Sequence, residues 1–170
     1  MAGAALFSGF YLNELLMRLT ARHDPHPALF DAYAQTLPAL VERDDRVVEA
    51  ALRAFEIVLL KELGVLPDLS LQTLTLAPVE EGGRYALVPD AGVAAGRGAD
   101  GELAGSTLIG LQAALEHGSL AAVQSRCAEA LPELKTMLRA LLHYHLGSPV
   151  MRTRQVMLDV QNLSANPSST

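Results

Sequence analysis

The stretch from Asp44 to Gly64 constrains the fold most, because it carries both the start and the stop signal of a helix. Asp44 and Asp45 are residues that cap helix N-termini, and Gly64 is the residue type that most often ends a helix. Between them the apolar residues fall at helical spacing: Val48, Leu52, Phe55, Leu59 and Leu63. The pattern predicts an amphipathic helix with one face buried against other elements.

Helical spacing returns in most of the chain. It predicts further helices over residues 5–22, 27–42, 107–117, 119–130, 132–146 and 152–163. Pro25 and Pro27 must end the first of these, and Pro38 should kink or shorten the second. Half of the residues are apolar, but only 5% are aromatic and none is tryptophan, so the core must be built from Leu, Ala, Val and Met. The expected fold class is mainly α, a bundle built from five or six of these helical segments.

Residues 66–106 differ in composition from the helical parts. They are rich in Gly, Pro, Thr and Val, with strand-like runs at 69–76, 84–88 and 92–95 and a Gly82-Gly83 turn between the first two. Residues 96–105 are expected to form a mobile loop. We therefore expect a helical domain made of 1–65 and 107–163, a small irregular β insert at 66–106, and a disordered tail at 164–170.

The charge of the chain argues against autonomous binding to nucleic acid. The net charge is −6, and residues 1–118 hold 8 basic and 16 acidic side chains. A small basic excess follows in the last third, from Arg126, Lys135, Arg139, Arg152 and Arg154. Because proteins that wrap nucleic acid usually show a basic stripe, DNA contact by this chain alone should be weak, local to that third and sensitive to salt.

No pattern in the sequence indicates catalysis, a metal or a membrane. Cys127 is the only cysteine, which excludes an intrachain disulfide and a thiolate zinc site. The histidine pairs 23/26 and 143/145 lack the i, i+4 spacing of helical metal ligands. There is no secretory signal pattern, and no apolar run is long enough to span a bilayer. We expect no enzyme, no cofactor and no metal.

Four stretches of the chain, taken in order, form a recognisable set. They are ALFSGFYLNELL at 5–16, DPHPALFDAY at 24–33, ALRAFE at 51–56 leading to Leu63-Gly64, and residues 139–154 with MRTR at 151–154. Together they resemble the helical C-terminal part of RecO, a family of bacterial DNA recombination and repair proteins. The resemblance implies a cytoplasmic recombination mediator that binds DNA, contacts RecR and captures the acidic C-terminal tail of single-stranded-DNA-binding protein.

Two departures from the family pattern change what is expected. RecO proteins begin with an OB-fold domain that has no counterpart here, so either it was removed or the chain is a relative that lost it. Many members also carry four zinc-binding cysteines after the third helix, whereas residues 69–74 contain none. Zinc is therefore not expected, and protein docking becomes the favoured function over DNA binding.

The resemblance points to Arg53 as the residue that receives the tail. Such a tail ends in an apolar residue with a free carboxylate, which requires an apolar pocket beside a fixed guanidinium group. Leu52 and Phe55 would floor this pocket. The competing interpretation is a helix-surface ion pair, since Glu49 lies four residues before Arg53 and Glu56 three after it.

Two other functions stay open at this point. One is a weak DNA-binding module that uses Arg126, Lys135, Arg139, Arg152 and Arg154. The other is a self-associating helical protein without catalytic activity. A chain without the OB-fold would expose the apolar surface that this domain covers, and the mean hydropathy of +0.23 is consistent with a homodimer formed through it.

Overall fold

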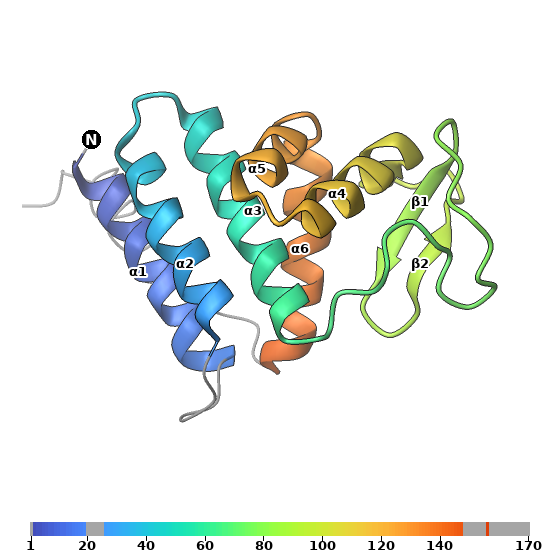
Figure 1. Cartoon of the computed structure of the whole chain (residues 1–170), viewed down its shortest axis with the longest axis horizontal. Helices are drawn as coiled ribbons and strands as arrows, with labels where there is room; N and C mark the ends of the chain where they lie inside the picture. The colour runs from blue at the N-terminus through green and yellow to red at the C-terminus, as the bar shows by residue number, and fades with distance from the viewer. Residues whose placement is uncertain (1, 20–25, 148–155, 157–170) are drawn as a thin grey trace, which may run out of the picture.

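The computed structural model describes residues 2–19, 26–147 and 156, and these form a helical bundle with a small sheet at one end (Figure 1). In the described residues the helices are α1 (Ala2–Leu19), α2 (Pro27–Thr36), α3 (Asp45–Glu62), α4 (Gly105–His117), α5 (Leu120–Ala128) and α6 (Leu131–Leu146). A 3-10 helix, η1 (Leu37–Val41), follows α2. The mainly α prediction is confirmed. The helix expected at 152–163 and the tail at 164–170 lie outside the described residues, Val156 excepted.

The central helix α3 begins and ends where its sequence signals predict. The Asp44 side chain accepts a hydrogen bond from the Arg46 N–H at 2.9 Å, and Gly64 takes the left-handed conformation with φ of 71°. Helix α3 packs against α2, α5 and α6, so Figure 1 shows it in the middle of the bundle. Because it has neighbours on several sides, its buried face is wider than the predicted stripe and includes Ala50, Ala51, Ala54, Ile57, Leu60 and the charged Glu56.

Proline and glycine set the ends of several other helices. Pro38 shortens the second predicted helix, because α2 ends at Thr36 and the chain continues as η1. Ser119 caps α5 by accepting a hydrogen bond from the Ala122 N–H, and Gly147 ends α6 with φ of 62°. These boundaries confirm the capping signals in the sequence.

The insert contains a three-stranded antiparallel sheet in the order β2-β1-β3. Strands β1 (Arg84–Val88) and β2 (Gly92–Ala95) confirm two predicted runs and pair with Tyr85 opposite Ala95, and β3 is Leu103–Ala104. Buried sheet side chains such as Leu87, Val93 and Leu103 belong to the same hydrophobic core as the helices. The insert is thus packed onto the bundle.

Two predictions for the insert were wrong. Residues 69–76 do not form a strand: Thr73 meets Val93 of β2, and Leu76 then turns the chain back with φ of 57°. Leu74 and Leu76 are therefore left exposed. The expected loop at 96–105 contains β3 and the buried Glu102, whose carboxylate accepts hydrogen bonds from the N–H groups of Arg97 and Ala99 at 2.5 and 3.1 Å.

Candidate docking site at the seam of α3 and α6

The least expected group in the bundle is the side chain of Glu56, a carboxylate that is 0% exposed in the middle of α3. Tyr11 of α1 donates a hydrogen bond from its hydroxyl to Glu56 Oε1 at 2.5 Å. Arg53, one turn earlier on α3, places Nη1 2.8 Å from Glu56 Oε2. The three side chains form a polar cluster, the Tyr11–Arg53–Glu56 cluster, that joins α1 to α3 inside the core.

The polar atoms of this cluster are only partly satisfied. The contact between Arg53 Nη1 and Glu56 Oε2 is close but lacks the alignment of a hydrogen bond, and Arg53 Nε is buried without a partner. The Arg53 side chain keeps 12% of its surface exposed. Buried groups left with spare hydrogen-bonding capacity are uncommon in folded proteins and mark places where a ligand or a strained contact belongs.

Burial controls the ionisation of the cluster. Loss of solvent raises the pKa of Glu56 above its ordinary value, while the nearby Arg53 charge and the Tyr11 hydrogen bond act in the opposite direction. The pKa of Tyr11 is raised well above its ordinary value by burial and by the Glu56 charge. The effect of burial on the Glu56 pKa is therefore larger than the opposing effect of the Arg53 charge. Further positive charge near the cluster would stabilise the ionised carboxylate.

That additional charge comes from α6. Arg139 and Lys135 both stabilise the ionised form of Glu56, so they lie within electrostatic range of the cluster. Lys135 also binds Glu49 of α3 at 2.8 Å, which ties the two helices together on the surface. Arg139 is exposed and forms no salt bridge with the part of the chain that the structure describes. Arg53, Lys135 and Arg139 thus gather along one seam between α3 and α6, the α3–α6 seam.

The apolar residues predicted beside Arg53 do not both reach the surface. Phe55 is 0% exposed and packs edge-on against Tyr33, with ring centroids 6.3 Å apart. It belongs to the core and does not floor a surface pocket. Leu52 is partly buried against the core and keeps some exposure beside Arg53.

The remaining predicted basic residues are not brought together. Arg126 of α5 pairs with Glu129 at 3.1 Å and lies over Gly110 of α4. No hydrogen bond or salt bridge among the described residues connects it to Lys135 or Arg139. Arg152 and Arg154 lie outside the described residues. Of the predicted basic residues that the structure describes, two therefore lie at the α3–α6 seam and one lies on α5.

Sequence reasoning missed Tyr11 and misplaced Glu56. The i, i+3 spacing of Arg53 and Glu56 correctly indicated an ion pair, but as a surface pair. The signal available in the sequence was weak: Glu56 is flanked by Phe55 and Ile57, and all three are buried. Cys127 is also buried, and burial raises the pKa of its thiol to about 12, which makes it inert at neutral pH.

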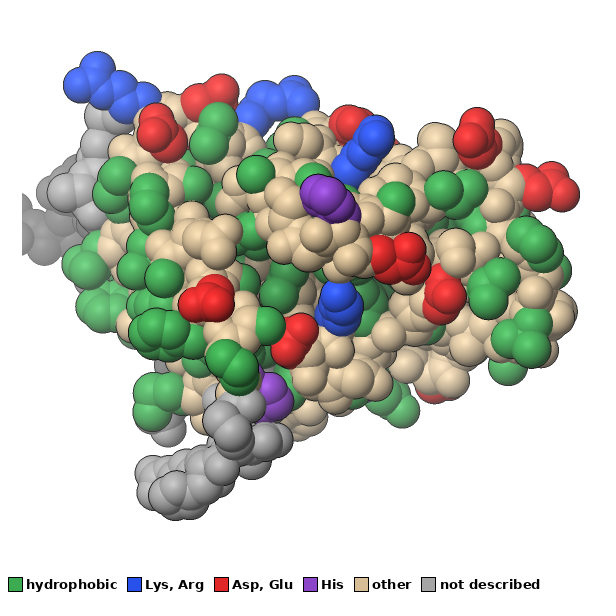
Figure 2. All heavy atoms as spheres, in the orientation of Figure 1, with side chains coloured by type: hydrophobic (Ala, Val, Ile, Leu, Met, Phe, Trp, Pro, Cys, Tyr) green, Lys and Arg blue, Asp and Glu red, His purple; other side chains and the backbone are tan. Residues whose placement is uncertain are grey.

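Large apolar side chains are exposed on α1, α2 and η1. On the face seen in Figure 2, charges of both signs are scattered, whereas hydrophobic side chains gather over α1 and α2. The large exposed apolar residues of α1, α2 and η1 are Leu6, Phe10, Met17, Phe30, Leu37 and Val41. In the described helices no segment is both long and apolar enough to cross a membrane. Among the same residues, no three candidate ligands come together to hold a metal ion.

Comparison with known proteins gives consistent matches. Residues 2–154 match the family model described as "Recombination protein O C terminal". The chain is 51% identical over 163 residues to a DNA repair protein RecO of Polaromonas sp., covering 95% of this chain and 66% of that protein. Identity is 49% to the protein of the same name from Verminephrobacter eiseniae and 46% to that from Albidiferax ferrireducens, covering 95% of this chain and 64% and 65% of those proteins. The chain thus spans just under two thirds of the length of these relatives.

Proposed function

The chain belongs to the RecO family, in the region of its C-terminal domain, and we propose that it serves DNA recombination and repair as a non-enzymatic docking module of the bacterial cytoplasm. The relatives are named as DNA repair proteins, which supports this class of function. The partners we propose are the C-terminal tail of single-stranded-DNA-binding protein and RecR, with DNA contacted weakly by this part alone.

The α3–α6 seam is the place where we propose that the acidic tail docks. Its free carboxylate would meet Arg139, which is exposed, and Arg53, whose guanidinium is held in place by Glu56. The observation that carries this proposal is that the Arg53 guanidinium is fixed on Glu56 of α3, while Arg139 of α6 is exposed within electrostatic range of that pair. A guanidinium group suits a carboxylate, because it offers a two-point fork of donors.

Leu52 supplies the apolar contact in this arrangement. It lies beside Arg53 on α3 and keeps part of its surface exposed, whereas Phe55 contributes from beneath by fixing the core under the helix. The last side chain of the tail would cover Leu52. This assignment keeps the predicted role of Arg53 and gives Phe55 a supporting role.

A labelled peptide with the acidic sequence and free apolar C-terminus of such a tail tests the site by fluorescence anisotropy. We expect Arg139→Ala to weaken binding about tenfold, the usual effect of losing one charged hydrogen-bonding partner. Arg53→Lys keeps a charge beside Glu56 but loses the fork, and should weaken binding to a similar extent. Arg126→Ala removes a charge from α5 and serves as the matched control.

Two outcomes of this experiment would contradict the proposal. Equal affinity of the parent chain, Arg53→Lys and Arg139→Ala would exclude the α3–α6 seam as the tail site. Binding of single-stranded DNA at low salt that is lost in both Lys135→Ala and Arg139→Ala, without any tail binding, would favour the DNA-binding alternative. The molecular mass of the same samples by light scattering reports whether the apolar face of α1 and α2 forms a homodimer.

A further inference from the structure

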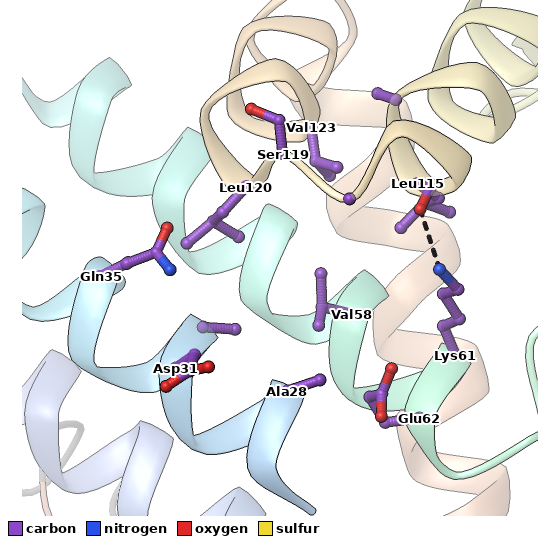
Figure 3. Close-up of a pocket in the computed structure, with 13 residues that line it drawn as sticks. Ala28, Asp31, Gln35, Val58, Lys61, Glu62, Leu115, Ser119, Leu120 and Val123 are labelled. Atoms are coloured by element: carbon purple, nitrogen blue, oxygen red, sulfur yellow. Dashed lines mark hydrogen bonds between the residues drawn. The ribbon is translucent and has the colours of Figure 1, made fainter.

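A groove lies on another side of the bundle from the α3–α6 seam, between α2, α3 and the turn that joins α4 to α5. Its volume is about 250 Å³, and Figure 3 shows the side chains that line it. The lining is apolar at its centre, where Val58 projects from α3 and faces Leu115, Leu120 and Val123 from α4 and α5. None of its lining residues belongs to the proposed tail site.

Acidic side chains dominate the rim of this groove. Asp31 of α2 and Glu62 of α3 lie along one edge, on either side of Ala28 (Figure 3). Neither carboxylate has a hydrogen bond or a salt bridge with the residues that the structure describes. Within the described residues, the rim therefore offers two negatively charged hydrogen-bond acceptors without a partner, next to an apolar floor.

The one cation of the rim does not neutralise these carboxylates. Lys61 extends toward α4 and donates a hydrogen bond from Nζ to the carbonyl oxygen of Leu115 at 2.9 Å (Figure 3). This bond satisfies a carbonyl in the last turn of α4 and fixes one wall of the groove. With one ammonium against two carboxylates among the described lining residues, the rim has a net negative charge.

We propose that this groove binds a short cationic segment of a partner protein, with one aliphatic side chain in the groove and adjacent Lys or Arg residues on Asp31 and Glu62. The floor residues Val58, Leu115 and Leu120 match an aliphatic side chain, and the free carboxylates complement the flanking cations. The domain would then carry two docking sites of opposite charge preference. An acidic tail binds at the α3–α6 seam, and a basic segment binds in the groove.

Fluorescein-labelled peptides test this proposal with the intact chain. The probe contains one leucine followed by two arginines, and matched peptides replace the arginines by glutamates or the leucine by serine. We expect the parent chain to bind the first peptide in a salt-sensitive way and the other two at least about tenfold more weakly. Binding that is equal for all three peptides, or absent with the first, would overturn the proposal.

Variants then locate the binding. Asp31→Asn combined with Glu62→Gln removes both charges with little change of shape and should weaken binding of the Leu-Arg-Arg peptide about tenfold. Glu81→Gln combined with Asp100→Asn makes the same change of net charge on exposed insert residues outside the groove and should leave affinity unchanged. Equal weakening by both pairs would show a non-specific charge effect. Dimerisation of the parent chain that only the groove pair abolishes would make a second copy the occupant. Either result contradicts the proposal.

This outcome is independent of the proposed tail site. The groove pair should leave binding of the acidic tail peptide unchanged, and Arg139→Ala should leave binding of the cationic peptide unchanged. Loss of both activities in either variant would mean that the two surfaces are not separate sites, and the groove proposal would fail. Failure of tail binding alone would affect only the proposed function.

Discussion

Among the residues that the structure describes, two carboxylates are buried, Glu56 and Glu102, and their surroundings shift their pKa values in opposite directions. Glu56 lies in the middle of α3 and is met by the side chains of Tyr11 and Arg53. Glu102 precedes the short strand β3 and is met by backbone N–H groups of Arg97 and Ala99. Burial raises the pKa of Glu56, whereas backbone hydrogen bonds lower the pKa of Glu102.

The difference follows from what the backbone can offer in each place. Inside a helix the N–H groups are already bonded to carbonyls one turn back, so a buried carboxylate depends on side chains that must be brought in from elsewhere. In a tight turn, successive N–H groups are free and converge on one acceptor. A carboxylate is therefore easily satisfied in the insert and only partly satisfied in the bundle, where Glu56 Oε2 is left without a hydrogen bond.

The largest expected effect is the loss of the bundle carboxylate. Glu56→Ala leaves the Arg53 guanidinium and the Tyr11 hydroxyl without their partner in the interior, which should lower the free energy of unfolding by about 3 to 5 kcal/mol. Glu49→Ala is the matched control, because it removes an ion pair to Lys135 in which both side chains are about half exposed. The control should cost no more than about 1 kcal/mol. Urea unfolding measures both, and a Glu56→Ala cost as small as that of the control would show that the cluster does not hold the bundle.

The next largest effect is on the pH dependence of the unfolding free energy, to which Glu56 and Glu102 should contribute in opposite directions. The folded-state pKa of Glu56 is raised above 4.5, so its contribution to stability is present below that pH and is lost as the pH rises through the raised value. The folded-state pKa of Glu102 is lowered from 4.5, so its contribution is present above that pH and is lost as the pH falls through the lowered value.

Glutamine variants isolate these contributions, because the amide does not titrate. The difference in unfolding free energy between the parent and Glu56→Gln should fall as the pH rises from about 4 toward 7, and that between the parent and Glu102→Gln should fall as the pH drops below about 4.5. Urea unfolding across this range measures both. If these two differences in unfolding free energy changed with pH in the same direction, the opposite pKa shifts of Glu56 and Glu102 would be contradicted.

The sequence predicted most of the bundle and less of the insert, because helix ends depend on local signals whereas the insert depends on contacts between residues distant in sequence. Helix ends depend on local signals, so Asp44, Pro38 and Gly147 placed boundaries that the structure confirms. The turn at Leu76 depends on contacts with a strand that comes later in the chain, through Thr73 and Val93. A carboxylate held by its neighbours' backbone, such as Glu102, leaves no trace in residue type or spacing.

The candidate site was predictable only where it is local. The pairing of Arg53 with Glu56 follows from their i, i+3 spacing on one helix. The approach of Tyr11 from α1 and of Arg139 from α6 depends on how three helices pack, which periodicity does not determine. The same packing buries Phe55, so a residue chosen as a surface contact turned out to belong to the core.

The smallest expected effect is an unchanged labelling rate of Cys127 in the Glu102→Gln variant. This measurement tests whether the bundle and the insert open separately. Cys127 is 0% exposed and its thiol pKa is raised to about 12, so a thiol reagent at neutral pH should label it only when the bundle opens. Helix α5, which carries it, packs mainly on α3 and α4.

Glu102→Gln loosens the turn before β3 and should leave the labelling rate of Cys127 unchanged. Glu56→Ala populates the open bundle and should increase the rate at least about a hundredfold, provided that reclosing is faster than labelling. Faster labelling in Glu102→Gln would mean that the insert and the bundle unfold as one unit, which their shared hydrophobic core permits. The two carboxylates would then stabilise a single structure, one through side chains and the other through backbone N–H groups.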